Sequence, residues 1–582
     1  MPRAKVGEAA HPRVALISKR GRFLFGELLF EQGPRLDLAG GKRVRAGRLA
    51  LLQPGRRGAR VLRELGSPSS ARDVVEALIL DRGLRRGFPA GLEADAREAA
   101  ADARDGKQQR RDLRDLATFT VDPATARDFD DAVSADETEG GGVRLWIHIA
   151  DVAAHVRPGT GLEAEARRRA NSVYVPGSVE PMLPLALSAE ACSLTPNEER
   201  LAVTAEVELS AGGEVSSARF YRSLIRSDAR LDYDEIDRIF AGTKRAPEVV
   251  ARPIDLARRA ARELAESAHP SLEVESAEPE FEFDGPDVVA ARAVPQTEAH
   301  RLIERLMILT NERVAELLER KKVPTLYRVH EQPDPDAIES LMEKMAALDL
   351  PTPQVPKHIS PSQAGEIAIE ASGLVTREAK RRGHGREAYT SLVLRSLKQA
   401  HYTDRNLGHA GLGSPAYAHF TSPIRRYPDL IAHRGLLSVI GAGEEAPSSK
   451  DVAEAGPYAS ERERDASRLE RDADSVCESF LLQRELFDAG PGAPFEGEVS
   501  GVIGAGAFVR FRGELADVYE GFLPARRIGG RERYELDESE TMLLGLRGGP
   551  AIRLGDPVTV SVDRVDAPRG RVDLLPVGKD QG

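Results

Sequence analysis

The chain has 582 residues, of which 41% are hydrophobic and 30% are charged. This composition is typical of a globular protein in water, and the length exceeds what one hydrophobic core organises, so we expect several domains. A formal net charge of -11 excludes a protein that coats nucleic acid through its overall charge, but it is compatible with a local basic channel beside an acidic site.

The cysteine count and the apolar segments indicate the cellular compartment in which the protein works. The 2 cysteines, Cys192 and Cys477, are far apart in the sequence, which is too few for a disulfide framework or a zinc cluster and suits a reducing cytosol. The N-terminal residues lack the apolar core of a signal peptide, and no run approaches the roughly 18 apolar residues of a membrane helix. We therefore expect a soluble, cytoplasmic monomer without membrane contact or a disulfide-linked partner.

Residues 1–66 have the pattern of a small β domain. Short apolar runs, GRFLFGELLF, VRAGRLALLQP and ARVLREL, are broken by Gly and Pro. Basic residues punctuate these runs: Lys19, Arg20, Arg22, Lys42, Arg43, Arg45, Arg48, Arg56, Arg57 and Arg60. The pattern predicts an OB-like barrel with a basic face, and a plain β domain with solvated arginines is the alternative.

Residues 67–110 are predicted to be a helical linker. Ser70 can cap the helix SARDVVEALILDRGL, Asp73 stands in the capping-box position and Gly83 can end the helix. Residues 90–114 are charged and rich in Ala, and we expect an exposed helix there.

The stretch from Thr118 to Ala132, TFTVDPATARDFDDA, concentrates acidic residues. Apolar β patterns flank it at 118–121 and 143–152, so we expect a loop between two buried strands. Four carboxylates fall within ten residues: Asp122, Asp128, Asp130 and Asp131. In a poorly solvated site they repel one another, and a divalent cation such as Mg²⁺, Mn²⁺ or Ca²⁺ relieves this.

The spacing of these acids also bears on the number of ions. Asp128 and Asp130 alternate and can face one way, whereas Asp131 faces the other, so a pocket that uses all of them suggests an irregular loop and two ions. Two ions about 3.5–4 Å apart can activate a water and stabilise the leaving oxygen in phosphodiester hydrolysis. A solvated acidic turn and a structural calcium loop are the alternatives.

The region 111–490 mixes strands and helices. We predict a strand at 201–209, a long amphipathic helix at 301–319, a Pro- and Ser-rich loop at 351–363 and a long charged helix at 456–488. A Gly/Pro hinge at 491–494 then precedes residues 494–577, whose pattern is typical of an S1-type OB barrel. Aromatic and basic residues there suit base stacking over a cationic groove, or a core role for some of the aromatics: Phe508, Phe511, Phe522, Arg510, Arg526 and Arg527.

Two blocks resemble the catalytic signature of the ribonuclease II and ribonuclease R family, the RNB nucleases. The four acids meet the family's spacing, and the block AYAHFTSPIRRYPDLIAHR covers 416–434. Further blocks follow in family order: VYVPGSVEPMLP from Val173, CSLTPNEERLAV from Cys192, YRVHEQPDPDAI from Tyr327 and LRSLKQAHYTDRNLGHAGL from Leu394. The resemblance implies a multidomain α+β fold with an N-terminal cold-shock-type OB domain, a mixed α/β RNB catalytic domain and a C-terminal S1-type OB barrel.

The resemblance also implies an activity: processive hydrolysis of single-stranded RNA from its 3′ end, which lies in a channel, to 5′-mononucleotides in RNA turnover. Asp122, Asp128 and Asp131 match metal ligands, and Asp130 matches the ligand closest to the chemistry, with two Mg²⁺ or Mn²⁺ ions. Arg425 matches the cation beside the scissile phosphate, and Arg426 is expected to hold a neighbouring phosphate or to form a structural salt bridge.

Further RNA contacts follow from the resemblance. Tyr174 matches a tyrosine that stacks on the 3′-terminal base, and the aromatic partner of that clamp falls at Val274, so the clamp is one-sided or uses Phe281. Tyr233 and Glu304 match positions that read the ribose, whose 2′-hydroxyl distinguishes RNA from DNA. Glu470 matches a glutamate that faces the active site.

Two other functions remain open. One is a catalytically weak RNA-binding protein of RNB fold that acts through its OB domains, and loss of a signature Asp would favour it. The other is a metal phosphodiesterase that acts on DNA or on nucleotides. All four signature acids are present, which favours the exoribonuclease.

Overall fold

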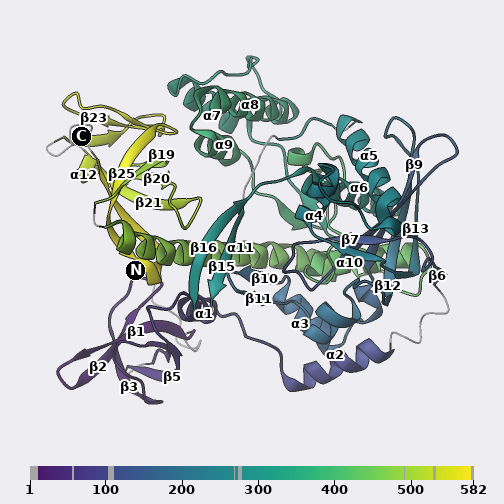
Figure 1. Ribbon diagram of the computed structural model, residues 1–582, viewed down its shortest axis with the longest axis horizontal. Helices are drawn as coiled ribbons and strands as arrows, with labels where there is room; N and C mark the ends of the chain where they lie inside the picture. Colours follow the sequence, from purple (N-terminus) through teal and green to yellow (C-terminus); the bar gives the residue numbers. More distant parts are fainter. Residues whose placement is uncertain are drawn as a thin grey trace.

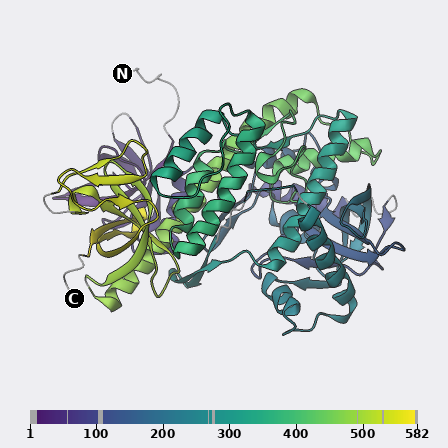
Figure 2. The same cartoon turned by 90° about the horizontal axis from the view of Figure 1, so that it is seen from above.

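The computed structural model describes residues 11–55, 58–102, 110–267, 269–272, 278–490, 492–528 and 532–577. Two β-barrels, one from each end of the chain, lie at one end of the molecule, and a larger mixed body lies at the other (Figures 1 and 2). The 41-residue helix α11, Ser449–Ala489, runs from the body to the barrels. The expected long charged helix is therefore present and begins seven residues earlier than predicted.

The N-terminal barrel closes in the order β1-β2-β3-β5-β4. Its strands are β1 (Arg13–Arg20), β2 (Phe23–Leu28), β3 (Leu36–Gly41), β4 (Leu49–Gln53) and β5 (Ala59–Gly66). Its core consists of alternate strand positions, among them Ile17, Leu52 and Val61. The predicted OB-like β domain is confirmed, and the expected basic residues Arg56 and Arg57 lie outside the described part of the chain.

Helix α1 (Ala71–Asp81) begins as the capping signal predicts, because the Ser70 hydroxyl accepts the amide of Asp73 at 3.2 Å. The capping box is not completed, since the Asp73 carboxylate accepts the amide of Ser67 instead. Helix α2 covers Ala90–Asp102. The expectation of a helix up to residue 114 is wrong for its last part, because β6 (Arg111–Asp112) joins the main sheet beside β13.

The central body is built on a seven-stranded sheet in the order β14-β7-β8-β9-β12-β13-β6. The strands are β7 (Phe119–Val121), β8 (Asp131–Glu137), β9 (Val143–Ala150), β12 (Glu199–Leu209), β13 (Val215–Arg226) and β14 (Ala229–Leu231). The sequence predicted β7, β9 and β12 but not β8, because the acidic residues at both of its ends disguise its apolar centre. The loop that carries the acids therefore ends at Asp131, the first residue of β8.

Helices cover this sheet and complete the main core. Ile254 and Ala257 of α5, Leu306 of α6 and Leu430 of α10 are buried in one cluster with the sheet. The helices are α3 (Gly161–Arg169), α4 (Tyr233–Phe240), α5 (Ala251–Ser267), α6 (Glu298–Lys321) and α10 (Tyr427–Val439). Two short pairs complete the body: β10 (Val173–Val175) with β11 (Ser178–Glu180), and β17 (Tyr327–Val329) with β18 (His401–Thr403).

Three helices form a separate layer above the body in Figure 1. They are α7 (Pro335–Ala347), α8 (Pro361–Arg382) and α9 (Arg386–Arg395). Their own hydrophobic core includes Leu554 of the C-terminal region. The predicted loop at 351–363 ends at Ser360, whose hydroxyl caps α8 by accepting the amide of Gln363.

The C-terminal barrel closes in the order β19-β20-β21-β26-β25. Its strands are β19 (Pro494–Ile503), β20 (Gly506–Phe511), β21 (Tyr519–Pro524), β25 (Pro557–Asp566) and β26 (Arg571–Pro576). A short helix, α12 (Ala525–Ile528), and a small sheet of β22 (Tyr534–Leu536), β23 (Met542–Gly545) and β24 (Ile552–Arg553) are attached to it. The predicted C-terminal barrel is thus confirmed.

The aromatic residues of this barrel divide between surface and core. Phe508 is 36% exposed and its ring lies 5.2 Å from that of Phe522, whereas Phe511 is 2% exposed and packs against Phe495 and Tyr519. Residues three positions apart on a strand point to opposite faces, so Phe508 and Phe511 could not both face a ligand. Of the two roles that the sequence left open for these aromatics, Phe511 has the core role, and base stacking by Phe508 stays a prediction.

The two barrels share one hydrophobic cluster with α1, α11 and the hairpin of β15 (Glu278–Asp284) and β16 (Asp287–Val294). Phe495 and Tyr519 of the C-terminal barrel contribute to it together with Leu481 of α11 and Val288 of the hairpin. The barrel that follows the predicted hinge is therefore packed into a common core, and Pro491, the first residue of that hinge, lies outside the described residues. No described helix has the length and the apolar content needed to span a bilayer.

Candidate active site

The acidic loop between β7 and β8 is fixed by its backbone. The Ser193 hydroxyl accepts the amide of Phe129 at 3.0 Å and donates to the carbonyl of Arg127 at 2.9 Å. The Asp130 carbonyl accepts the amide of Ala150 at the end of β9, and the Phe129 carbonyl accepts the amide of Leu194. The CSLTP segment around Ser193 thus holds the loop in one shape.

The second predicted block meets the acidic loop at Asp130. The amide of Ile424, 294 positions along the chain, donates to Asp130 Oδ1 at 2.8 Å. The Arg425 guanidinium lies with Nε 3.5 Å from Asp130 Oδ2, and its side chain is 48% exposed. The structure therefore brings together the two residues predicted to be catalytic, one buried and one open to a ligand.

Burial shapes the chemistry of these acids. Asp130 is 3% exposed, and burial raises its pKa well above the ordinary value against the opposing effects of Arg425 and the Ile424 amide. Burial and the charges of Asp131 and Asp130 raise the pKa of Asp122, and burial raises the pKa of Asp131 to about 6. The protein groups around these carboxylates therefore do not supply enough positive charge to offset their negative charge.

The donor set fits a divalent cation. Asp122 Oδ2 and Asp130 Oδ2 are buried and accept no hydrogen bond within the described residues, and carboxylate oxygens are the ligands that Mg²⁺ and Mn²⁺ prefer. Within the described ranges, no three His, Cys, Asp or Glu side chains already form a metal-holding group. The fit therefore rests on the donor chemistry and the uncompensated charge, not on preformed coordination.

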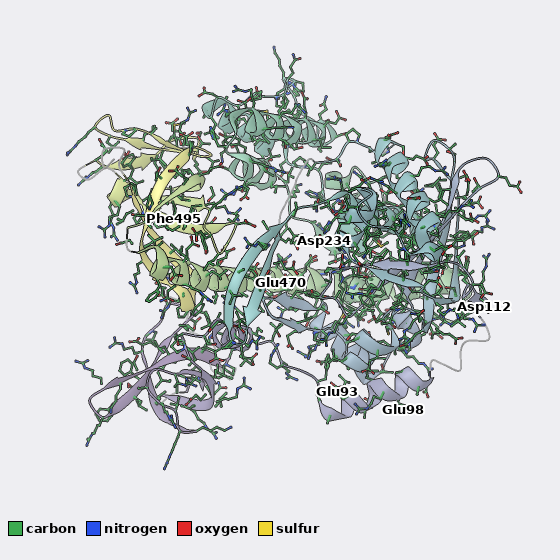
Figure 3. All side chains as sticks on the ribbon, viewed as in Figure 1. Glu93, Glu98, Asp112, Asp234, Glu470 and Phe495 are labelled. Atoms are coloured by element: carbon green, nitrogen blue, oxygen red, sulfur yellow. The ribbon has the colours of Figure 1, made fainter. Side chains whose placement is uncertain are left out.

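Tyr174 forms a second side of the site, next to the acidic loop. It lies on β10 with 39% of its surface exposed, its hydroxyl donates to Asp128 Oδ2 at 3.1 Å, and its amide donates to Glu470 Oε1 at 2.9 Å. Glu470 lies on α11 beside the β15–β16 hairpin (Figure 3). The Glu470 carboxylate thus holds the backbone of Tyr174, a role that the sequence did not reveal.

A pocket of about 170 Å³ opens between Tyr174, Arg425 and helix α11, next to the acids but not lined by them. It brings together four residues predicted to contact RNA and several that were not predicted. Its polar lining comprises Asn171, Ser172, Tyr174, Tyr402, Arg425, Arg426, Glu463, Ser467 and Glu470. Glu463, Ser467 and Glu470 follow helical spacing on α11, which is the signal that could have identified the first two.

The guanidinium of Arg426 is bound by a carboxylate within the protein. It donates to both carboxylate oxygens of buried Asp429, at 2.9 and 2.7 Å, and the other end of this network is the Ser422 amide. A bidentate pair of this kind fixes the loop that carries Arg425. The geometry favours the structural salt bridge over a phosphate contact for Arg426.

Tyr233 and Glu304 lie on the side of β14 and α6. Tyr233 begins α4, and its ring stacks on that of His300 at 3.9 Å between centroids. Burial and the charges of Asp131 and Asp122 raise the pKa of the Tyr233 hydroxyl. Glu304 lies exposed on α6, one helical turn after His300. His300 was not predicted, although its i, i+4 spacing to Glu304 indicates a common face.

The structure does not test the expected clamp partner of Tyr174. Val274 lies outside the described residues. Phe281 on β15 is half-buried and packs against the shared core of α1, α11 and the barrels. The role of Phe281 as a clamp partner stays a prediction.

Comparison with known proteins places this chain. The family model described as RNB domain matches residues 110–442. The chain belongs to the RNB family. It is 35% identical to Ribonuclease R of Aquifex aeolicus over 526 residues, which are 88% of this chain and 72% of that protein. It is 34% identical to Ribonuclease R of Escherichia coli over 511 residues, 84% of this chain and 60% of that protein.

The RNB fold extends over almost the whole chain. The RNase R structures from Mycoplasma genitalium, in an apo form and in complex with ribose methylated single-stranded RNA, are similar with a TM-score of 0.86 and 24% identity. The likeness covers 98% of this chain and 90% of those chains. Both barrels around the RNB body are therefore part of the arrangement shared with RNase R.

Proposed function

We propose that this RNB protein is a hydrolytic, processive 3′-to-5′ exoribonuclease that degrades single-stranded RNA to 5′-mononucleotides in RNA turnover. The observation that carries the proposal is the Asp130 site, where a buried carboxylate without enough counter-charge faces a half-exposed arginine. The names of the relatives and the RNA in the Mycoplasma structure support this class of substrate.

The proposed metal ligands are Asp122, Asp128, Asp130 and Asp131, with two Mg²⁺ or Mn²⁺ ions. Membership of the family implies a divalent metal, and the uncompensated carboxylates support the ligand set. When bound, such ions supply Lewis-acid polarisation of a phosphoryl oxygen and a water of lowered pKa. A Ca²⁺ loop of helix–loop–helix type is disfavoured, since β7 and β8 flank the acids.

The remaining catalytic contributions come from side chains of this chain. Arg425 is half-exposed beside Asp130 and Ser422 and can present a planar fork to phosphate oxygens, which can stabilise charge that grows in the transition state. The Ile424 amide and the Arg426–Asp429 pair hold the Arg425 loop against Asp130. The acid and the arginine thus share one rigid support, which keeps the phosphate in register with the carboxylates.

Tyr174, with its ring at the pocket and its hydroxyl on Asp128, is proposed to stack on the 3′-terminal base. Tyr233 and Glu304 are proposed to read the ribose, with His300 supporting Tyr233. Arg426 and Glu470 are proposed to shape the pocket. The division 1–66, 67–110, 111–490 and 494–577, the monomeric state and the cytoplasmic location stay predictions.

Degradation assays on matched oligomers test this function. We expect a 5′-labelled RNA to shorten progressively from its 3′ end in Mg²⁺, with mononucleotides as the product, while the DNA of equal sequence persists. RNA binding without cleavage in Mg²⁺ or Mn²⁺ would indicate the catalytically weak binding protein. Equal cleavage of DNA would indicate a general metal phosphodiesterase. A 3′-blocked RNA serves as the control for direction.

A further inference from the structure

The β15–β16 hairpin, residues 278–294, connects the C-terminal barrel to the rest of the molecule, and we call it the strap. The Ala291 amide donates to the Leu515 carbonyl at 2.8 Å, and Ala291 bridges Ala516. The Ala293 amide donates to Asp517 Oδ2 at 2.8 Å. One edge of the strap is therefore paired with the 513–517 loop between β20 and β21.

Helix α11 fixes this same loop. The Glu485 carboxylate accepts the amides of Glu514 at 2.9 Å and Leu515 at 3.2 Å, and it accepts the Tyr519 hydroxyl at 2.9 Å. A side chain at Gly513 would come within 2.4 Å of that carboxylate, so only glycine leaves room for it. The loop that holds the strap is thus seated on α11 by a buried acid.

The other side of the strap reaches the hairpin that carries Tyr174. Gly177, with φ of +72°, makes the turn between β10 and β11, and a side chain there would meet the Phe283 ring at 3.2 Å. Val173 and Val175, the neighbours of Tyr174, are buried in the cluster that also contains Val288 and Ala291 of the strap. Packing therefore continues from the barrel loop through the strap to the Tyr174 strand.

Helix α1 holds the tip of the strap. The Arg72 amide donates to the Pro286 carbonyl at 3.3 Å, and the Arg72 guanidinium lies 5.7 Å from the centre of the Phe283 ring. Phe283 is thus enclosed between α1 and the Gly177 turn. Its ring lies against the Gly177 turn of the hairpin that carries Tyr174.

We infer that Phe283 is a positioning residue that sets Tyr174 at the pocket, and that the C-terminal barrel supports it through the strap. Phe283 contacts neither the acids nor Arg425 in the described interactions, so it acts through Tyr174. Tyr174 in turn donates to Asp128, which links its position to the acidic loop. The effect on turnover rests on the proposed function, whereas the mechanical link does not.

A double-mutant cycle tests the kinetic part on the full chain. We expect Phe283→Ala to lower kcat/KM on single-stranded RNA about tenfold, mainly through KM, which is within the range of one lost base stack. In a Tyr174→Ala background the same substitution should change kcat/KM less than about twofold, because the residue that it positions is gone. Equal effects in both backgrounds would overturn the inference.

Hydrogen exchange tests the link without RNA or catalysis. Amides 173–175 should exchange several-fold faster in Phe283→Ala and in Asp517→Ala, which loses the acceptor of the Ala293 amide. Asp517→Asn keeps an acceptor oxygen and should restore slow exchange, and Glu282→Ala, at an exposed position of the strap, should leave it unchanged. Unchanged exchange in Phe283→Ala overturns the inference. Faster exchange in a protein that does not cleave RNA would refute the proposed function alone.

Discussion

The site has two sides, the acids of the 122–131 loop (the acid wall) and the surroundings of Tyr174 (the Tyr174 wall), and they are built in different ways. The acid wall comes from one loop and one strand of the RNB sheet, and two short segments, around Ser193 and Ile424, fix it by hydrogen bonds. The Tyr174 wall comes from α11, the strap and the β10–β11 hairpin, and its packing reaches both barrels. On the proposed function, the chemistry is therefore local to the RNB body, whereas the proposed hold on the 3′-terminal base depends on distant domains.

The largest effect is expected at the acid wall. Asp130→Asn keeps an acceptor for the Ile424 amide but removes the charge, so turnover should fall by a factor of about 1,000 or more, as for a lost transition-state interaction of about 4 kcal/mol. RNA affinity should persist, because a less negative site repels phosphate less. Turnover and affinity are measured on one labelled oligomer. Asp136→Asn, exposed on the strand β8 that follows the loop, is the matched control, and turnover within tenfold of wild type would remove Asp130 from the chemistry.

Arg425→Lys probes the same wall with charge conserved. Lysine loses the planar fork that meets two phosphate oxygens, so we expect turnover to drop about a hundredfold with binding little changed, which corresponds to about 2.7 kcal/mol. Single-turnover rates and affinities separate the two quantities. Arg226→Lys, on the exposed end of β13, controls for the substitution itself. Weaker binding with normal turnover would show that Arg425 only grips phosphate.

The Tyr174 wall is broken most broadly by ending the chain after Ala493. The catalytic blocks end before this point, which predicts an active nuclease, but the strap loses the partners of Ala291 and Ala293. We expect single-turnover cleavage of a short oligomer to fall about tenfold and long RNA to bind more weakly with a shallower salt dependence.

A second variant separates these two effects of truncation. Phe508→Ala with Phe522→Ala in the full chain removes the exposed aromatic pair of the barrel and leaves its buried core in place. This variant should bind long RNA more weakly and should cleave the short oligomer at the rate of the wild type. Circular dichroism is used to check that the truncated protein is folded. Undiminished single-turnover cleavage after truncation would mean that the Tyr174 wall stands without the barrel.

The sequence reveals the acid wall far better than the Tyr174 wall, for a physical reason. Metal ligands and the arginine must keep their chemical type and spacing, so Asp122 to Asp131 and the SPIRRY block are legible, and the structure joins them at Ile424 and Asp130. Strand β8 was missed because acids at its ends obscure it. Phe283 and Glu485 act by contact with segments far away in the sequence, which no local pattern encodes. The stacking of His300 on Tyr233 is also a long-range contact, and only the spacing of His300 to Glu304 hinted at it.

The walls also differ in how their buried acids are neutralised. Along α11 beyond Glu470, burial and the charges of Glu470 and Glu278 raise the pKa of Asp474 to about 7. Burial and the charges of Asp474 and Glu520 raise the pKa of Glu478 to about 8. At the acid wall a metal ion can offset the negative charge. At Asp474, Arg471 lowers the pKa, but burial and the charges of Glu470 and Glu278 outweigh its effect. These α11 acids are therefore expected to take up protons instead.

The smallest prediction follows from this difference. A carboxyl whose folded pKa is raised binds its proton more tightly than in the unfolded chain, so its stabilising contribution is full below about pH 4 and is lost as pH rises to about 7–8. In saturating Mg²⁺, which should keep the acids of the acid wall ionised throughout, the free energy of unfolding should fall between pH 5 and pH 8. Asp474→Asn with Glu478→Gln should flatten this slope and stabilise the protein at pH 8 by an amount of the order of 1 kcal/mol.

Denaturant unfolding at several pH values measures this slope, with Asp472→Asn on the same helix as the control for a charge removed near the surface. A slope that the double substitution leaves unchanged would show that these acids are ionised and solvated at neutral pH, and the two walls would then not differ in this respect.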